Sequence, residues 1–432
     1  MPVKILLIGS GGREHAFAWK LSQSKKCEKL FIAPGNAGTS ECGENVDFDV
    51  TSFLAIKEFV LQNKIELVII GPEEPLVNGI TDFFLEDEKL KLIPVIGPTK
   101  AGALLEGSKD FAKEFMLKNS IPTAAFQTFT KETLHDGLKF LETLNAPFVL
   151  KADGLAAGKG VIIPETLEAA KSELTEMLTS GRFGKAGNKV VIEEFLKGIE
   201  CSVFVLTDGE SYKILPEAKD YKRIGEGDTG LNTGGMGAVS PVLFADANFM
   251  SKVEERIIKP TISGLKNANI LYRGFIFIGL MNVGGDPYVI EYNVRMGDPE
   301  TEVVIPRIKN DLVELFLATG NEELNEIDLE IDSRTAVTIM MVSGGYPGDY
   351  EKGKAINIGS TNNSLIFHAG TKLTSHNSVV TNGGRVLSVT GLGESISEAK
   401  AIAYEQIESI KFENQFFRKD IGMDLLKLKE KA

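Results

Sequence analysis

Residues Tyr288–Thr301 read YVIEYNVRMGDPET, an apolar run interrupted by an acid, an amide and a guanidinium. If the run is a β-strand, alternation of its side chains places Glu291, Asn293 and Arg295 on one face, and Val289 on that same face. Such polar groups are costly to bury unless they bind something. They suit Mg²⁺ beside a triphosphate, because Mg²⁺ takes hard oxygen ligands and shares itself with phosphates. Arg295 would stabilise a phosphoryl group during transfer. The alternative is a surface ion-pair cluster.

A glycine-rich segment lies upstream of this strand-like run. Asp153–Gly160 reads DGLAAGKG and separates two strand-like runs. It is not a P-loop, because only three residues lie between Gly154 and Gly158 and no Ser or Thr follows the lysine. A glycine hairpin between strands can fold over nucleotide phosphates, with backbone N–H donors and Lys159 supplying positive potential. An ordinary hairpin is the alternative, but Lys151 on the preceding strand favours the nucleotide.

The first ~100 residues predict an open, doubly wound parallel sheet, since short apolar runs alternate with helix-like segments. In such sheets ligands bind beyond the carboxyl ends of the strands. The runs are Val3–Ile8, Leu30–Ala33, Leu67–Ile70 and Val95–Ile96.

The turn after the first run is a candidate anion site. Gly9–Glu14 reads GSGGRE and opens a helix, whose N-terminal N–H groups favour an anion. A dinucleotide fingerprint is disfavoured, because Glu14 stands at the third glycine and Ala33-Pro34-Gly35 replaces the ribose-binding acid. A phosphate or ribose-phosphate site is expected instead. A plain tight turn is the alternative.

Two further segments are candidates for ligand binding. Pro216–Gly237 is a long, polar loop whose local cations indicate an anionic substrate in an otherwise acidic chain. Val190–Val205 reads VVIEEFLKGIECSVFV and could form a hinge that packs on an adenine, with Glu200 accepting hydrogen bonds from a ribose. An exposed acidic hairpin is the simpler interpretation of the second segment.

Composition excludes several classes of protein. The net charge of −13 argues against a broad nucleic-acid surface. No apolar run approaches the ~18 residues that would predict a membrane span. The opening MPVKILLIGSGG is too short an apolar stretch for a signal peptide. Cys27, Cys42 and Cys201 form neither a disulfide framework nor a zinc motif, so a cytoplasmic location is expected.

Together the motifs resemble the phosphoribosylamine–glycine ligase family of the ATP-grasp superfamily. DGLAAGKG, EEFLKGIECS and IEYNVRMGDPET are similar to an ATP-grasp module. The order GSGGREHA, APGNAGT, GPEEPLV, LEGSK, NTGGMGAVSP, GGYPGDY and NGGRV is that of the family and covers essentially the whole chain. The resemblance implies an α/β and α+β multidomain protein. Its domains would be an N-terminal α/β substrate-binding domain (1–104), an ATP-grasp domain (105–330) and a C-terminal β-rich domain (331–432).

The chemistry implied by the resemblance is ligation of glycine to 5-phosphoribosylamine. ATP phosphorylates the glycine carboxylate, and the amine then displaces phosphate to give glycinamide ribonucleotide, a step of de novo purine biosynthesis. Mg²⁺ or Mn²⁺ would accompany ATP. No nucleic-acid or membrane partner is expected, and a monomer is expected, with a dimer as the alternative.

The resemblance also implies a set of site residues. The implied metal ligands are Glu291 and Asn293. The implied catalytic residues are Arg295, Lys151 and Lys219. The implied ATP contacts are Lys109, Lys151, Gly154, Gly158, Lys159, Gly160, Glu193, Phe195, Leu196 and Glu200. The implied substrate contacts are Gly11, Gly12, Arg13, Asn36, Asp220, Lys222, Asp298 and Thr301.

Two positions depart from the family pattern. Tyr221 stands where His is common, which leaves a proton-transfer role at that position open, and Met296 stands where Phe is more usual. Three other functions remain as alternatives: a different ATP-grasp enzyme, a nucleotide-binding regulator without turnover, and an NAD-dependent oxidoreductase. The aligned metal and phosphoryl groups count against a regulator, and Glu14 and Ala33 count against NAD.

Overall fold

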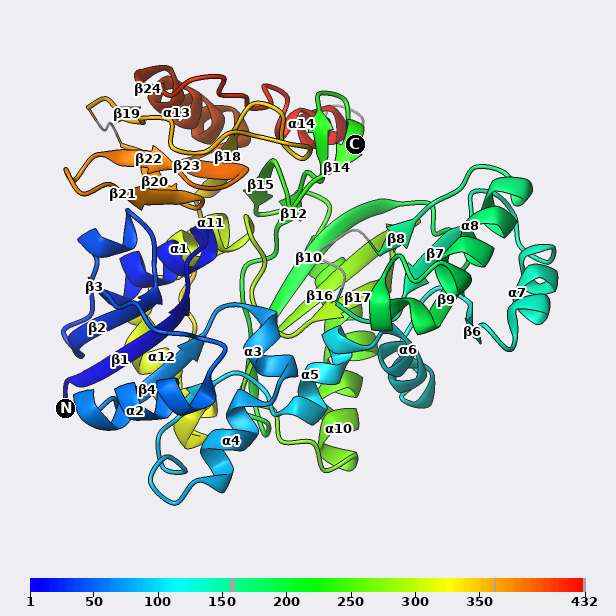
Figure 1. Cartoon of the computed structure of the whole chain (residues 1–432), viewed down its shortest axis with the longest axis horizontal. Coiled ribbons are helices and arrows are strands. Elements are labelled where there is room, and N and C mark those ends of the chain that lie inside the picture. The colour runs from blue at the N-terminus through cyan, green and yellow to red at the C-terminus, as the bar shows by residue number, and fades with distance from the viewer. Residues whose placement is uncertain (156–159, 361–362, 430–432) are drawn as a thin grey trace.

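The structure is a computed structural model that describes residues 1–155, 160–360 and 363–429. Figure 1 shows a blue N-terminal region at the left, a central region extending to the right, and an orange and red C-terminal region at the top. A parallel sheet forms the first region and antiparallel sheets form the other two. The predicted mixture of an α/β start and a β-rich end is therefore confirmed.

The N-terminal sheet has the strand order β3-β2-β1-β4-β5, which is that of a doubly wound sheet. Alternate residues of its central strand face different helices: Leu6 and Ile8 pack in one core cluster, and Ile5 and Leu7 pack in another. The strands are β1 (Val3–Gly9), β2 (Cys27–Pro34), β3 (Glu44–Asn45), β4 (Leu67–Ile70) and β5 (Val95–Ile96). The covering helices are α1 (Gly12–Leu21), α2 (Phe53–Asn63), α3 (Glu73–Val77), α4 (Ile80–Glu86) and α12 (Leu312–Asn321).

The central region contains two antiparallel sheets joined to the first region through α5 (Lys100–Gly107) and α6 (Lys109–Lys118). The outer sheet, at the right of Figure 1, is covered by α7 (Leu134–Leu141) and α8 (Leu167–Thr179). Its strands are β6 (Phe126–Thr130), β9 (Lys189–Glu193), β7 (Val149–Ala152) and β8 (Val161–Ile162). The inner sheet contains β11 (Tyr212–Ile214), β10 (Ile199–Thr207), β16 (Gly274–Val283) and β17 (Asp286–Asn293), and it packs on α9 (Ala247–Val253) and α10 (Lys259–Asn267).

Strand β17 has a bulge beside its polar side chains. Gly279 of β16 pairs with Glu291, but Leu280 pairs with Val289, so Ile290 is the extra residue. One extra residue reverses the alternation of faces. Val289 consequently packs in the apolar core with Tyr292, and the expectation that Val289 shares the face of Glu291 is wrong.

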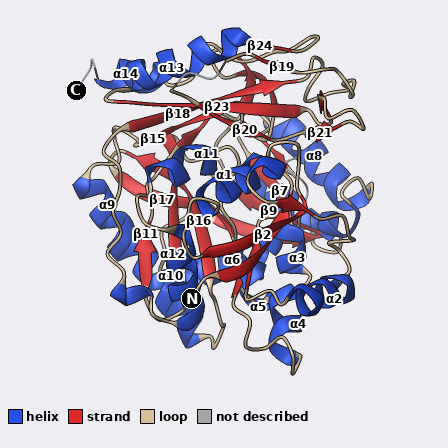
Figure 2. Cartoon of the chain, turned by 90° about the vertical axis from the view of Figure 1, so that its left-hand side faces the viewer, coloured by secondary structure: helices blue, strands red, loops and turns tan. Residues whose placement is uncertain are grey.

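The C-terminal sheet has the order β12-β15-β18-β23-β20, seen edge-on at the top of Figure 2. Its first two strands come from the polar loop region that precedes residue 241, so the sheet joins residues far apart in sequence. The strands are β12 (Lys219–Asp220), β15 (Gly237–Ser240), β18 (Thr335–Val342), β23 (Arg385–Gly393) and β20 (Leu365–His368). The hairpin β13 (Arg223–Gly225) and β14 (Thr229–Asn232) lies between β12 and β15 in sequence, and α11 (Thr301–Val304), α13 (Ile396–Ser409) and α14 (Met423–Lys429) complete the region.

Among the described helices, none combines the length and the apolar character needed to cross a membrane.

Candidate functional site

Glu291 lies in a small cavity between the inner central sheet and β12, where Glu200, Asp220 and Lys222 also line the wall. Burial alone would raise the pKa of Glu291, but nearby cations outweigh burial and hold that pKa below its usual value. The carboxylate is therefore ionised and faces a strongly positive environment. The cations are Lys222, Lys151, Lys109 and Arg295.

Two buried lysines, one of which acts on Glu291, share one buried glutamate. Lys151 on β7 and Lys113 on α6 lie 2.8 and 2.9 Å from the two carboxylate oxygens of Glu193 on β9. Lys151 also donates to the carbonyl oxygen of Ile290, the bulged residue, at 3.0 Å. Burial lowers the pKa of Lys113 to about 8. The bulge on β17 thus supplies an acceptor that ties the two central sheets together at Lys151.

Lys113 was not among the predicted residues, because it reads as one more charged position of an amphipathic helix. Its second contact is the hydroxyl of Thr123, to which it donates at 2.7 Å. Glu193 was predicted to lie beside adenosine. In the structure it is the counterion of both lysines.

The glycine hairpin is described only at its two ends. Lys109, at the start of α6, donates to the carbonyl oxygen of Gly154 at 3.0 Å, and Gly154 has a positive φ of 129° that favours glycine. At the other end Gly160 accepts a hydrogen bond from the backbone N–H of Ala152 at 2.8 Å. Gly158 and Lys159 lie outside the described residues.

Arg295 lies in the bend after β17 rather than on the strand, which ends at Asn293. Its guanidinium donates to the side-chain oxygen of Asn293 at 3.2 Å and to Glu106 at 2.9 Å, and it pairs with Glu73 at 3.4 Å. Glu106 also accepts from the backbone N–H of Val294 at 2.8 Å. Glu73 on α3 and Glu106 on α5 therefore orient the Arg295 guanidinium. Neither acid was predicted from the sequence as a site residue.

Glu291 at this cavity and Asn293 two residues further along β17 fit a Mg²⁺ or Mn²⁺ ion that is shared with phosphates. Glu291 offers an ionised carboxylate and Asn293 an amide oxygen, both hard ligands. Within the described ranges, no three His, Cys, Asp or Glu residues come together as a self-sufficient metal site. Such an ion would thus take its other ligands from a nucleotide and water, as Mg²⁺ commonly does.

The predicted adenosine segment runs from β9 through a turn into β10, on which Glu200 lies. Phe195 is exposed, Leu196 is half-buried, and Glu200 is exposed and pairs with Lys222 at 3.1 Å. Lys222 connects this segment to the cavity, because it pairs with Glu200 and also lines the cavity wall. The charges of Asp220 and, to a smaller extent, Glu200 raise the pKa of Lys222. The cluster joins the predicted ribose contact to the predicted metal ligand.

Polar groups at the turn after β1, together with Asn36, form the N-terminal rim of the site. Arg13 is buried and donates to Glu14 at 2.6 Å and to the carbonyl oxygen of Met296 at 3.1 Å. The N–H of Gly11 donates to the same Glu14 at 2.6 Å. Gly12 needs to be glycine, since a Cβ there would lie 2.3 Å from a carboxylate oxygen of Glu302. The rim therefore contacts the segment after β17 directly.

Asn36 is fully engaged in holding the rim together. Its amide group donates to the carbonyl oxygens of Ser10 and His368 at 2.9 and 2.7 Å. Its side-chain oxygen accepts from the backbone N–H groups of Gly38 and Thr39. These contacts span three parts of the chain, and they give Asn36 a structural explanation that needs no ligand.

Asp298 and Thr301, the predicted glycine contacts, differ in their surroundings. Asp298 pairs with Arg385 of β23 at 3.0 Å, beside Gly11 of the rim. Thr301 is fully buried at the start of α11, and its hydroxyl donates to the carbonyl oxygen of Gly297 at 2.5 Å. Arg385 also donates to the carbonyl oxygens of Gly234 and Asp298, so it links the polar loop to this turn.

Lys219 and Tyr221 flank Asp220 but belong to a different contact. The ammonium of Lys219 lies 3.1 Å from Asp424, and the hydroxyl of Tyr221 donates to the other oxygen of Asp424 at 2.5 Å. Asp220 lines the cavity with Glu291. The structure therefore brings Asp220, Lys222, Glu291, Asn293 and Arg295 together with the lysine pair, and places Lys219 at the periphery.

Comparison with known proteins gives this geometry a family. Family models described as the N domain, the ATP-grasp (A) domain and the C domain of phosphoribosylglycinamide synthetase match residues 3–106, 107–301 and 336–424. The chain is 46% identical to phosphoribosylamine–glycine ligase of Escherichia coli (strain K12), over 97% of this chain and 98% of the relative. It is 45% identical to phosphoribosylamine–glycine ligase of Yersinia pestis over the same shares.

Solved structures agree with the sequence relatives. The crystal structure of phosphoribosylamine–glycine ligase from Thermotoga maritima matches with a TM-score of 0.84 at 37% identity, and covers 97% of this chain and 100% of its own. The biotin carboxylase domain of Hydrogenobacter thermophilus 2-oxoglutarate carboxylase, solved with MgADP, has a TM-score of 0.72 at 15% identity and covers 96% and 92%. The second likeness concerns the fold alone, and the prediction of a central ATP-grasp module is confirmed. The chain therefore belongs to the phosphoribosylamine–glycine ligase family.

Proposed function

We propose that the chain ligates glycine to 5-phosphoribosylamine with ATP, giving glycinamide ribonucleotide, ADP and phosphate. The observation that carries this proposal is the 46% identity to phosphoribosylamine–glycine ligase over 97% of the chain, and the cations Lys222, Lys151, Lys109 and Arg295 that act on Glu291 agree with it. Glu291 and Asn293 would hold Mg²⁺ or Mn²⁺, which supplies charge neutralisation and orientation for the phosphates when bound.

The first chemical step is transfer of the γ-phosphoryl group to a glycine carboxylate oxygen, so that an O–P bond forms and the bond to ADP breaks. Lys151 and Lys109 would hold the phosphates, and Arg295 would stabilise the charge on the group in transfer. Glu73 and Glu106 keep the Arg295 guanidinium oriented during this step. A carboxylate becomes a good acyl donor only after such activation.

In the second step the amine nitrogen of phosphoribosylamine attacks the acyl carbon, the C–O bond to phosphate breaks and the amine loses a proton. Activation on the substrate, rather than on the enzyme, is supported by Cys201. This thiol lines the cavity, yet burial raises its pKa, so it stays protonated and is a poor nucleophile.

The two substrates would meet between the rim and the polar loop. Arg13 and the glycines of the rim would hold the ribose phosphate, and Asp298 with Asp220 and Lys222 would face the glycine and the amine. The proposed domain limits remain 1–104, 105–330 and 331–432. We further propose a cytoplasmic location, a monomer with a dimer as the alternative, and no nucleic-acid or membrane partner.

Isotope transfer tests the acyl phosphate route. Glycine labelled with oxygen-18 in its carboxylate should pass one label to the released phosphate, and phosphate release should require both glycine and freshly prepared phosphoribosylamine at stoichiometry with the amide. Label in ADP, or none in phosphate, would exclude glycyl phosphate. Phosphate release without amide formation would point to another ATP-grasp activity.

A further inference from the structure

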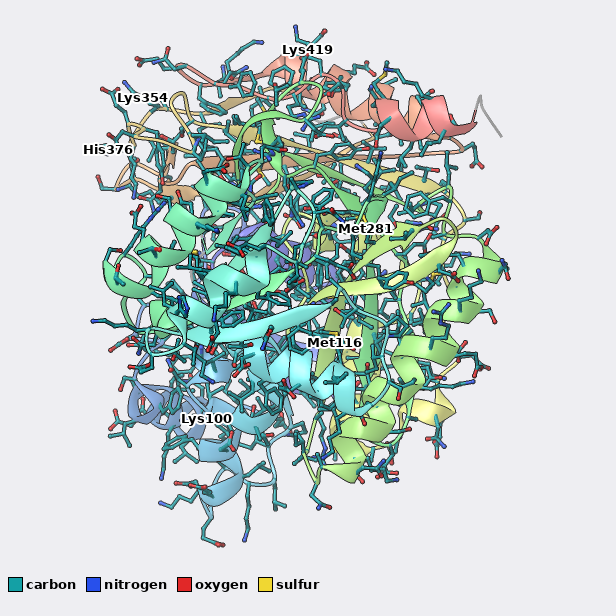
Figure 3. All side chains as sticks on the ribbon, turned by 90° about the vertical axis from the view of Figure 1, so that its right-hand side faces the viewer. Lys100, Met116, Met281, Lys354, His376 and Lys419 are labelled. Atoms are coloured by element: carbon teal, nitrogen blue, oxygen red, sulfur yellow. The ribbon has the colours of Figure 1, made fainter. Side chains whose placement is uncertain are left out.

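Two segments nearly two hundred residues apart meet at the edge of the site. Residues 221–235 of the polar loop follow the strand that carries Lys219 and Asp220. The C-terminal clamp, residues 418–424, leads into the last described helix, α14. In Figure 1 the red α14 lies beside the green β14 of the polar loop, and Lys419 of the clamp is labelled at the upper edge of the molecule in Figure 3.

The outer half of the polar loop is held by Arg418. This side chain is 1% exposed, and it donates to the carbonyl oxygen of Arg223 at 3.0 Å and to Asp228 at 2.8 Å. Asp420 completes the contact by accepting from Arg418 and from the backbone N–H of Gly227 at 2.7 Å. A buried arginine with this many partners is a rigid anchor for a loop that is otherwise largely exposed.

The inner half of the loop is held through Tyr221. Its hydroxyl donates to Asp424 at 2.5 Å and accepts from the backbone N–H of Gly422 at 3.0 Å. Burial, together with the charge of Asp424, raises the pKa of Tyr221. A protonated hydroxyl with both partners supplied from the clamp has no free role in proton transfer. Tyr221 therefore attaches the polar loop to the clamp.

Lys219 is held by the same carboxylate. Its ammonium lies 3.1 Å from the second oxygen of Asp424 and 3.8 Å from the centroid of the Tyr221 ring. Lys219 is buried, so the ion pair and the ring together replace its hydration. The adjacent residue, Asp220, lines the cavity with Glu291. A shift of Lys219 would therefore move Asp220 relative to Glu291.

We propose that Asp424 is a positioning residue, which fixes Lys219 and Tyr221 and thereby sets Asp220 and the polar loop in their reactive places. Lys219 acts through this contact and does not touch the transferred phosphoryl group. The kinetic part of this proposal rests on the ligase activity proposed above, because it assumes that Asp220 serves that reaction.

The decisive variant is Asp424→Asn, which keeps the shape of the side chain and removes its charge. Turnover should fall about tenfold, as expected for a lost hydrogen-bonded charge pair. The KM for ATP should stay within about twofold, because Lys113, Lys151 and Glu193 are remote from the clamp in the described contacts. A merely destabilised protein would lose turnover without exposing one particular lysine.

A measurement independent of activity follows the lysine itself. A brief pulse of an amine-acetylating reagent, read by mass spectrometry, should modify Lys219 at least about threefold faster in Asp424→Asn than in the parent chain, because the buried ammonium has lost its partner. The matched control is Glu413→Gln. Glu413 pairs with Lys354, which keeps Glu351 as a second partner, so that variant should leave both the acetylation of Lys219 and the turnover unchanged.

Tyr221→Phe is the second variant in case Asp424→Asn does not fold, since it removes one hydroxyl and keeps the ring. It should give the same pattern with a smaller effect. Unchanged acetylation of Lys219 in a folded variant overturns the proposal, and so does unchanged turnover in an active enzyme. If the parent chain shows no ligase activity, the acetylation result still decides whether Asp424 fixes Lys219, and the two failures are distinguished.

Discussion

The nucleotide side of the site and its N-terminal rim both start from polar residues beside glycine turns, but they use those residues differently. On the nucleotide side, where ATP is proposed to bind, Lys151, Glu193 and Glu291 come from separate strands, Lys151 pairs with Glu193, and the charge of Lys151 lowers the pKa of Glu291. On the rim, the side chain of Asn36 forms hydrogen bonds with backbone groups of its own and neighbouring segments. Similar patterns in the sequence thus lead to a charged cavity in one place and to hydrogen bonds that hold chain segments together in the other.

The difference teaches that a polar residue near a glycine turn indicates a ligand when it carries a charge that its contacts with the backbone do not neutralise. The rim joins three segments whose backbone N–H and C=O groups need partners, and Asn36 supplies them. On the central sheets the ladders pair most backbone groups, and although Lys151 and Lys109 each donate to one carbonyl oxygen, these contacts leave the two lysine charges in place to act on Glu291. Arg13 is intermediate, because it is bonded to Glu14 and Met296 yet lies at the ligand end of the sheet.

The largest expected effect is on the nucleotide side. Lys151→Ala and Glu291→Ala should each lower turnover by at least ~100-fold while the protein stays folded, as with loss of a charge-stabilising group. Steady-state phosphate release with circular dichroism checks this. Lys189→Ala is a matched control, because Lys189 is an exposed lysine on β9 that pairs with Asp110. Near-normal turnover of Glu291→Ala at saturating Mg²⁺ would remove Glu291 from the metal site.

On the rim, Asn36→Ala should act mainly on stability. It leaves two N–H donors and two carbonyl acceptors without partners, at a cost of about 2 kcal/mol or more. Urea denaturation measures the loss, and the KM for phosphoribosylamine should change little in the folded variant. A tenfold rise of that KM at unchanged stability would erase the contrast between the two regions.

Arg13→Ala tests the intermediate case. It should raise the KM for phosphoribosylamine about tenfold, the effect of one lost charge-assisted contact, with the KM for ATP nearly unchanged. Initial rates at varied concentrations of each substrate decide. A rise in the KM for ATP instead would show that the rim serves the nucleotide.

The smallest effect concerns the joint beneath the rim, where His15 and His368 are buried against each other. Burial lowers the pKa of His15 to about 3 and that of His368 to about 4. The unfolded chain binds protons near pH 6.5 and the folded chain does not, so stability is full above that pH and falls as the pH decreases. We expect a loss of about 1 kcal/mol per histidine between pH 6.5 and 5.5.

Denaturation curves at the two pH values measure this effect. His15→Gln should flatten the dependence, whereas replacement of the exposed His376, labelled in Figure 3, should leave it intact. An unchanged slope in His15→Gln would mean that other groups cause the acid sensitivity.

Prediction from the sequence succeeded where local patterns are sufficient. The parallel sheet followed from apolar runs that end in glycine turns, and the strand that carries Glu291 and Asn293 followed from its sequence pattern. The same reasoning missed the bulge at Ile290, because an insertion relative to a partner strand exists only when both strands are paired. It also missed Lys113, Glu106 and Arg385, whose patterns are those of ordinary charged positions.

By itself, the sequence determined the order of the elements, the family and the identity of the groups that can carry charge. Only the tertiary structure decided which of those groups face the cavity and which satisfy one another. The physical reason is that pairing depends on contacts between distant segments, such as Lys113 with Glu193 and Tyr221 with Asp424, which are 203 residues apart in the second case. A buried charge is stable only with a partner, and the fold alone assigns the partner.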